Sequence, residues 1–249
     1  MNSIKGLEIF KEKFKNFTGN YVIIGGTACK ILLESMYIDF RSTKDIDMVL
    51  IAENMTNDFK EAIIEFVYEG KYEIWKDEYN KCHYFRFQKP KNDDFPYMIE
   101  LLSINDSINF NKRYTPLFIK DEKIKSLSAI IIDEDYYNLI VMNKIILNDL
   151  SIANSKVLAL LKMKAYIDIF IRKKNDLNVF ENPKKHQNDV YRLVEIFNNE
   201  KMIVVDSIKQ DIKKFLELNS LNDDILKQLK IRTSKAQLDD IIRRTFNIK

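Results

Sequence analysis

The residues best suited to chemistry are two carboxylates, Asp45 and Asp47, which stand two positions apart in a strand-like run at residues 44–50. In a β-strand, residues i and i+2 point to the same face, so these side chains present four oxygens side by side. Like charges at this spacing repel, and each raises the cost of ionising the other. A divalent cation with hard oxygen ligands relieves that repulsion. The spacing therefore predicts a metal site.

A glycine pair, Gly25 and Gly26, follows an apolar run at residues 20–24 and precedes a predicted helix at residues 28–36. The first N–H groups of a helix have no partner within the helix, and they favour anions. Because glycine has no Cβ, the backbone there can approach a triphosphate closely. A phosphate-binding glycine turn beside two carboxylates that bind a cation predicts a site for a nucleoside triphosphate with Mg²⁺ or Mn²⁺.

A third acid, Glu100, stands inside the apolar run at residues 97–102, which is typical of a buried strand. A charged side chain in such a run needs a partner. Either Glu100 joins Asp45 and Asp47 as a metal ligand, or it forms a salt bridge with Arg41 or Arg86.

The order of these motifs resembles the DNA polymerase β superfamily of nucleotidyltransferases, in which Gly-Gly/Ser is followed by Asp-x-Asp and then by an acid on a neighbouring strand. The narrower resemblance is to the AbiEii-type family, which includes toxins of bacterial toxin–antitoxin and phage-abortive systems. The resemblance spans about residues 20 to 193 of this chain. The segments that carry it are Gly25-Gly26-Thr27-Ala28, Arg41-x-Thr43-Lys44-Asp45-Ile46-Asp47, Lys162-Met163-Lys164-Ala165 and Lys185-His186-Gln187-Asn188-Asp189-Val190-Tyr191.

The resemblance implies a role for each matching residue. The implied nucleotide-binding residues are Gly25, Gly26, Thr27, Arg41, Thr43, Lys44 and Lys162, with Lys162 contacting a phosphate. The implied catalytic residues are Asp45, Asp47, Glu100 and Asp189. Asp189 matches the second acid of the family's Arg-Asp-x-x-Asp element, but Lys185 and His186 stand where Arg-Asp is usual, so the chain departs from the pattern there.

The segment at residues 157–171 is apolar on nearly every face, which predicts a buried helix. Burying a lysine costs several kcal/mol unless an acid or phosphate compensates it, so Lys162 or Lys164 should reach a charged partner. The alternative is that both extend to solvent along their aliphatic stems. Lys164 has a second option in Asp168 at i+4. For Asp189, the alternative to catalysis is a surface pair with Arg192 or Lys185.

Composition narrows the class of protein. The chain has 249 residues, of which 46% are hydrophobic and 31% charged, and it contains no apolar run near the roughly 20 residues that cross a bilayer. We therefore expect a cytoplasmic protein without a membrane partner, with Cys29 and Cys82 reduced. Residues 1–150 carry 20 Lys/Arg against 24 Asp/Glu, and residues 151–249 carry 20 against 13. The basic second half suits a polyanion such as RNA.

Hydrophobic periodicity predicts an α+β fold, with a mixed β-sheet flanked by helices at residues 1–150 and a C-terminal helical bundle at residues 151–249. The resemblance implies that residues 1–150 form a nucleotidyltransferase domain and that the first helices of the bundle close over the active cleft. Ser234 to Gln237 has the form of a capping box that starts the last helix. The expected elements are helices at 4–16, 28–36, 55–68 and 135–148, strands at 20–24, 45–51, 72–75, 82–87 and 97–102, shorter strands or extended chain at 115–132, and helices throughout from 154.

The resemblance implies a magnesium-dependent nucleotidyltransferase that moves a nucleoside monophosphate from an NTP to an acceptor. RNA, such as a transfer-RNA end, is the expected acceptor, and a toxin role with an antitoxin protein as partner goes with the narrower family. Two alternatives stay open. One is a protein or small-molecule acceptor, and the other is a non-catalytic protein of the same fold that binds a nucleotide or a partner protein.

Overall fold

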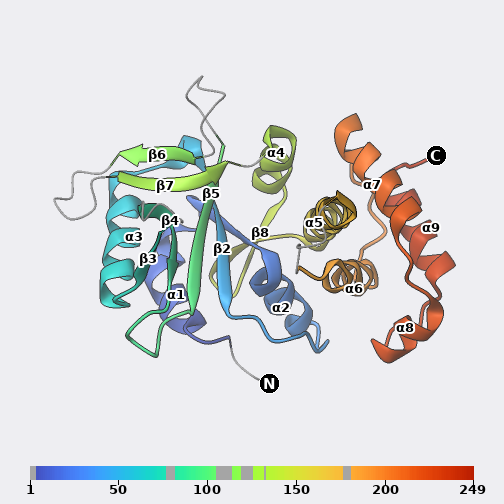
Figure 1. Cartoon of the computed structure of the whole chain (residues 1–249), viewed down its shortest axis with the longest axis horizontal. Coiled ribbons are helices and arrows are strands. Elements are labelled where there is room, and N and C mark those ends of the chain that lie inside the picture. Colours follow the sequence, from blue (N-terminus) through green and yellow to red (C-terminus); the bar gives the residue numbers. More distant parts are fainter. Residues whose placement is uncertain (1–3, 77–81, 105–113, 119–125, 132, 176–180) are drawn as a thin grey trace. The chain divides into compact units, whose positions relative to one another are not determined.

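The computed structural model describes residues 4–76, 82–104, 114–118, 126–131, 133–175 and 181–249. The chain divides into two compact units, Met1–Ala153 and Asn154–Lys249. The first contains a mixed sheet with flanking helices, and the second is helical (Figure 1). The predicted α+β class is confirmed.

Within the described residues, the sheet of the first unit has nine strands, and seven of them follow the order β3-β4-β5-β2-β1-β9-β8. The central strand β2 is antiparallel to β1 and parallel to β5, so the sheet is mixed. β7 runs parallel to β5 at its far end and pairs with β6. The strands are β1 (Tyr21–Ile24), β2 (Asp45–Leu50), β3 (Glu73–Lys76), β4 (Cys82–Gln88), β5 (Met98–Ser103), β6 (Tyr114–Phe118), β7 (Ser126–Ile131), β8 (Lys144–Leu147) and β9 (Leu150–Ala153).

One face of the central strands is apolar and covered by aromatic side chains. Tyr21 of β1 packs edge-on against Phe10 and Phe14 of α1 (Leu7–Phe14) and stacks on Phe59 of α3 (Asn57–Glu69). Phe66 of α3 also contacts both α1 rings. Aromatic pairs of this kind bury large areas in favourable geometry. The register places the buried side chains Ile46, Met48, Leu50, Phe87, Ile99 and Leu101 on this same face.

Strand β1 leads directly into α2 (Gly25–Ser35), which starts three residues earlier than predicted. The N-cap position is Ile24, whose side chain offers no acceptor to the first turn. The helix packs against β1 and β2, and Figure 1 shows it beside β2. The predicted helix at residues 55–68 is confirmed as α3, and the N-terminal helix is confirmed as α1 followed by a 3₁₀ turn at Lys15–Phe17.

The helix predicted at residues 135–148 is wrong in its second half. Helix α4 spans Glu134–Met142, and β8 and β9 then form an antiparallel hairpin. Asn148 and Asp149 make its turn with φ of 51° and 61°. A two-residue hairpin turn of this type requires positive φ at both positions, and Asn and Asp tolerate it best after glycine. The predicted hairpin of β3 and β4 is confirmed as antiparallel, while its turn lies outside the described residues.

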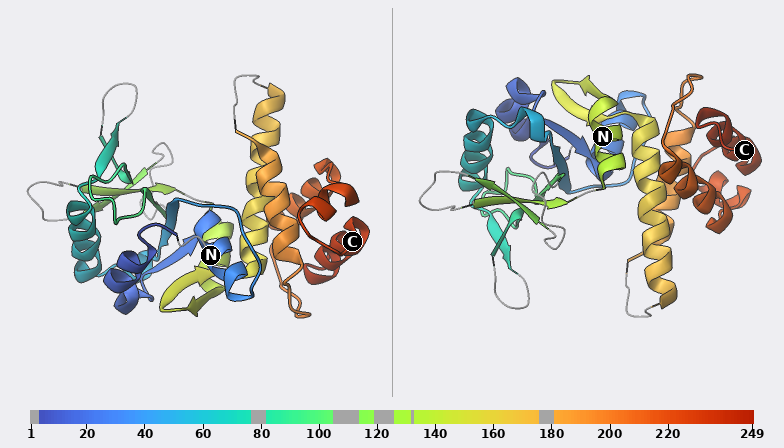
Figure 2. Two further views of the ribbon diagram at one scale, coloured as in Figure 1. Left: turned by 90° about the horizontal axis from the view of Figure 1, so that it is seen from below. Right: turned by 90° about the horizontal axis from the view of Figure 1, so that it is seen from above.

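The second unit consists of helices among its described residues, as predicted. Its helices are α5 (Ser155–Asn175), α6 (Pro183–Val194), α7 (Asp206–Leu218), α8 (Asp223–Gln228) and α9 (Lys235–Thr245). The long α5 runs alongside α6 in both views of Figure 2. The capping box at the start of α9 is confirmed, because the Ser234 hydroxyl accepts from the Gln237 N–H and the Gln237 side chain accepts from the Ser234 N–H.

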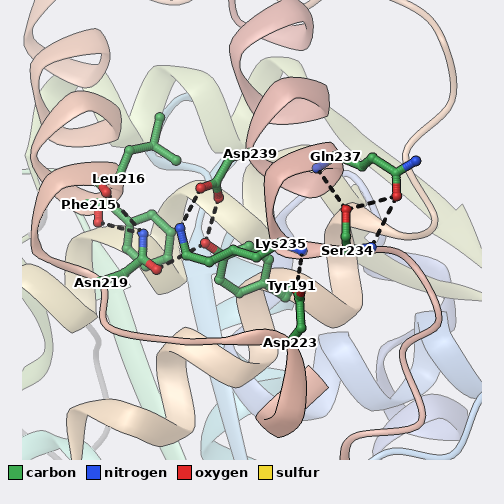
Figure 3. Close-up of polar contacts among 9 residues, drawn as sticks. All are labelled: Tyr191, Phe215, Leu216, Asn219, Asp223, Ser234, Lys235, Gln237 and Asp239. Atoms are coloured by element: carbon green, nitrogen blue, oxygen red, sulfur yellow. Dashed lines mark hydrogen bonds and ion pairs between the residues drawn. The ribbon is translucent and has the colours of Figure 1, made fainter. Parts of the chain in front are cut away.

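A polar network ties α6 to α7 and α9 inside this unit (Figure 3). The Tyr191 hydroxyl donates to Asp239 Oδ1 at 2.7 Å and lies 3.1 Å from Asn219 Oδ1. Lys235 Nζ lies 2.5 Å from Asp239 Oδ2. Burial and the neighbouring Asp239 carboxylate raise the pKa of Tyr191, so the phenol stays protonated and can donate. The network fixes the relative position of these helices, because the Tyr191 hydroxyl of α6 contacts Asp239 of α9 and Asn219 at the end of α7.

Among the described residues, no helix combines the length and the apolar character needed to cross a membrane.

Candidate active site

The turn between β1 and α2 lies directly against the carboxylate of Asp47. Gly25 has φ of 70°, in the left-handed region, and a Cβ added there would lie 2.0 Å from Asp47 Oδ2. Only glycine adopts this φ without strain and also has no Cβ to collide with the Asp47 carboxylate. Asp47 therefore faces the glycine turn, as the motif spacing predicts.

The loop before β2 packs on the first turn of α2. A Cβ on Gly26 would lie 2.9 Å from Thr43 Oγ1 and 3.7 Å from Arg41 Nη2. The Thr27 hydroxyl donates to the Asp45 carbonyl at 2.6 Å and lies 3.3 Å from Thr43 Oγ1. These contacts bring together two of the four motifs that carry the resemblance, the glycine turn and the segment that ends in Asp45 and Asp47.

The remaining residues of the loop have identifiable positions. Arg41 is exposed, and its guanidinium lies 5.2 Å from the centroid of the Phe40 ring. Lys44 is exposed as well, and its carbonyl accepts from the Tyr97 N–H at 3.2 Å.

Strand register places three acids on one face of the sheet. Asp45 and Asp47 are half-buried, whereas Ile46 between them is buried and points to the aromatic side. Asp47 stands opposite Glu100 of the parallel strand β5. Residues directly opposite in a ladder share a face, and neighbouring strands lie about 4.8 Å apart. Asp45, Asp47 and Glu100 thus lie on the face opposite the aromatic cluster.

Glu100 forms a salt bridge with Arg86 of β4, which is its direct partner in the antiparallel β4–β5 ladder. Arg86 Nε donates to Glu100 Oε1 at 2.7 Å, and Arg86 Nη2 donates to the same oxygen. Of the two arginines that the sequence offered to Glu100, Arg86 is the one that forms this salt bridge. The register of the β4–β5 ladder makes this choice, because it sets Arg86 directly opposite Glu100.

The donor set fits Mg²⁺ or Mn²⁺. Within the described residues, no group of three or more His, Cys, Asp and Glu side chains is arranged to hold a metal ion. Mg²⁺, however, is usually bound by one or two carboxylates together with substrate phosphates and water, so it needs no all-protein cage. Asp45 and Asp47 supply two such carboxylates on one face, and the absence of a Cβ at Gly25 lets the Asp47 carboxylate lie against the turn.

The site residues predicted in the second unit pair with each other. Lys162 of α5 is buried, and its Nζ lies 3.3 Å from Oδ2 of the buried Asp189 on α6. The expectation that a buried lysine finds a charged partner is confirmed, and the partner is an acid of the neighbouring helix. Lys164 lies 3.3 Å from Asp168, as one alternative predicted, and also 3.7 Å from Asp211.

No protein-family model matches this sequence, and no curated protein matches it. Solved structures do. An antigenic nucleotidyltransferase-like protein from Paracoccidioides brasiliensis matches with a TM-score of 0.45 and 9% identity, over 96% of this chain and 90% of that one. The antibiotic-resistance factor ANT(2'')-Ia matches with a TM-score of 0.37 and 10% identity, over 89% of this chain and 96% of that one.

The Megavirus polyadenylate synthase matches with a TM-score of 0.38 and 14% identity, over 85% of this chain and 37% of that one. This chain therefore spans little more than a third of that protein's length. Similarities of this size leave the function to be argued from the geometry of the site.

We expect Gly25→Ala to lower the free energy of unfolding by about 1–3 kcal/mol, because alanine is strained at this φ and its Cβ would displace Asp47. Gly19→Ala is the matched control, since nothing lies within 4 Å of a Cβ at that position. It should change the stability by less than about 0.5 kcal/mol. Urea unfolding followed by circular dichroism measures both. Equal, small effects would show that the Asp47 carboxylate does not lie on the turn.

We expect Lys162→Met to lower the free energy of unfolding by about 3 kcal/mol, because it leaves the buried Asp189 without this lysine. The control is Lys164→Met, whose side chain is 39% exposed, and it should cost less than about 1 kcal/mol. Urea unfolding compares the two variants. If Lys162→Met is as mild as its control, the Lys162–Asp189 pair does not compensate a buried charge.

Proposed function

We propose that this protein is a magnesium-dependent nucleotidyltransferase, with the fold of that superfamily in its first unit. The observation that carries the proposal is the contact of the Asp47 carboxylate with the Gly25 turn, while Asp45 lies on the same face and Glu100 stands opposite Asp47. A strand-to-helix glycine turn suits phosphate, and paired carboxylates suit a divalent cation. Their contact supports one site for a nucleoside triphosphate and its metal ion.

Each residue of the proposed site has a distinct task. Asp45 and Asp47 hold the cation, and the backbone N–H groups at the start of α2 bind phosphate oxygens. Arg41, beside Gly26, adds positive charge at the same helix end. The cation, when bound, neutralises charge on the triphosphate and lowers the pKa of a coordinated hydroxyl.

In the proposed reaction, a hydroxyl oxygen of the acceptor forms a bond to the α-phosphorus of the nucleotide. The bond from that phosphorus to its bridging oxygen breaks, and pyrophosphate leaves with the electron pair. The hydroxyl proton passes to a carboxylate, for which Glu100 is the first candidate because it stands beside Asp47. The resemblance names Asp189 as the second candidate and Lys162 as a phosphate contact, so variants of both belong in the same assay.

RNA is the proposed acceptor, and the charge distribution supports it. Residues 151–249 carry 20 Lys/Arg against 13 Asp/Glu, whereas the first 150 residues carry an excess of acid. A basic region attracts a polyanion and raises its local concentration. The alternative acceptors are a protein hydroxyl and a small molecule. Label transferred to either of them instead of RNA would identify it as the acceptor.

Nucleotide binding without transfer is a second candidate function, and the Arg86–Glu100 salt bridge favours it. That salt bridge engages the carboxylate that would otherwise serve as a third acid of the site. A protein that binds an NTP with Mg²⁺ but transfers no label to any acceptor would have this function.

We expect purified protein with Mg²⁺, labelled NTPs and total cell RNA to transfer label to RNA. Asp45→Asn and Asp47→Asn should each lower the rate at least about 100-fold, because each removes a charged cation ligand worth several kcal/mol in the transition state. Asp93→Asn, at a fully exposed position in the same unit, is the control. Circular dichroism checks that all variants fold. Activity that survives both site substitutions would exclude this site.

The toxin role that accompanies the narrower resemblance predicts a growth defect. Induction of the wild-type protein in a bacterium should reduce colony formation, whereas induction of Asp47→Asn at the same protein level should not. Co-expression of the neighbouring gene tests for an antitoxin. Normal growth with an active wild-type enzyme would contradict the toxin role and leave the transferase activity intact.

A further inference from the structure

Strand β1 ends before its ladder with β2 reaches Asp45. The last pair of this antiparallel ladder is Ile24 with Asp47, and in the same register the partner of Asp45 would be Gly26. The chain turns into α2 at Gly25 instead. Asp45, one of the two cation ligands of the proposed site, therefore lies beyond the last pair of the β1–β2 ladder.

The carbonyl of Asp45 points to the side on which β1 would continue. Backbone groups of a strand point to alternate neighbours from one residue to the next, and the N–H of Ile51, just after β2, donates to the carbonyl of Asn20, just before β1. The odd-numbered residues of β2 therefore face β1. The Thr27 hydroxyl donates to the Asp45 carbonyl at 2.6 Å, so it takes the place of the N–H that a longer β1 would supply.

Thr27 is fully buried, and its hydroxyl hydrogen is engaged by Asp45. A hydroxyl has one O–H donor and two acceptor lone pairs. Thr43 Oγ1, which lies 3.3 Å from Thr27 Oγ1, is therefore the donor in the contact between the two threonines. A chain of hydrogen bonds thus runs from Thr43 through Thr27 to the carbonyl of Asp45.

The position of the Asp45 carboxylate depends on the position of its main chain. Few rotatable bonds separate an aspartate carboxylate from the backbone, and they occupy discrete rotamers, so a shift of the main chain moves the carboxylate with it. On the β5 side, the Tyr97 N–H holds the neighbouring carbonyl of Lys44 at 3.2 Å. On the α2 side, the Thr27 hydroxyl holds Asp45 itself. Groups that bind a ligand have to stay within about 0.5 Å of their working geometry, so this hydrogen bond affects the cation site.

We propose that Thr27 is a positioning residue: its hydroxyl holds the main chain of Asp45, and with it the carboxylate, in place for the cation, and it does not contact the nucleotide. This inference rests on the proposed function, because it uses the same cation site. It differs from the resemblance, which implies that Thr27 binds the nucleotide. The two roles predict different effects when the hydroxyl is removed.

The first test measures Mn²⁺ affinity without nucleotide, from the electron paramagnetic resonance signal of free Mn²⁺. Thr27→Val keeps the shape of the side chain but loses the hydroxyl, and it should lower the affinity about tenfold, as is usual when a group that orients a metal ligand is removed. Thr27→Ser keeps the donor and should stay within about twofold of the wild type. Unchanged affinity in Thr27→Val would overturn the proposal. An equal loss in Thr27→Ser would also overturn it, because the methyl group would then be responsible.

Two further variants control this test. Thr56→Val removes the N-cap hydroxyl of α3, which accepts from the Phe59 N–H at 3.3 Å. It should lower the urea midpoint of unfolding but leave the Mn²⁺ affinity within about twofold. A loss of Mn²⁺ affinity as large as that of Thr27→Val would overturn the proposal, because lower stability alone would explain both. Thr27→Ala removes the same hydroxyl as Thr27→Val and should give the same loss, so it replaces that variant if Thr27→Val does not fold.

The second test asks whether Thr27 contacts phosphate, by calorimetry with inorganic tripolyphosphate in the presence of a metal chelator. The wild type and Thr27→Val should give the same binding curve, because the hydroxyl is engaged by Asp45. Weaker binding by Thr27→Val would overturn the proposal and assign Thr27 to the nucleotide. Failure of the proposed function gives a different result: Asp45→Asn would then leave Mn²⁺ binding unchanged. Failure of this inference alone leaves Mn²⁺ binding dependent on Asp45 but independent of the Thr27 hydroxyl.

Discussion

The contact between the Gly25 turn and the Asp47 carboxylate is the constraint on which the rest of the site depends. It requires a residue without Cβ at φ of 70°, and it requires Ile24 to stand opposite Asp47 in the β1–β2 ladder. A slip of one residue in that ladder would move both aspartates to the opposite face of the sheet. The Thr27 hydroxyl, bonded to the Asp45 carbonyl, opposes such a slip from the helix side.

The two faces of the sheet differ in character: one holds the aromatic core, and the other holds the acids of the candidate site. Aromatic side chains of α1 and α3 close one face around Tyr21, and the buried residues of β2, β4 and β5 point there. This core supplies apolar burial that does not involve the opposite face. Charged residues can therefore occupy the opposite face at the start of α2 without interrupting the core.

Much of the site could be predicted from the sequence, because its central features are local. The period of two in a strand places Asp45 and Asp47 on one face, and the glycine pair marks the strand-to-helix turn. Pairings between distant segments could not be predicted from the sequence. The pairing of Glu100 with Arg86 depends on the register of β4 and β5, and the pairing of Lys162 with Asp189 depends on how α5 packs against α6. The β8–β9 hairpin was missed because its isoleucine-rich strand has no period that separates it from the end of α4.

Stability alone does not account for the row of charges Asp47, Glu100 and Arg86. Apolar or β-branched residues at half-buried strand positions usually pack better than an ion pair, and replacing buried ion pairs by such residues is often neutral or stabilising. A sheet that needed only to fold would place valine or threonine there, as β1 and β2 do with Val22 and Val49 at the next pair of that face. These charges do not favour folding, and they lie beside a turn that is suited to phosphate. Departures of this kind from the usual packing preferences are expected at functional sites.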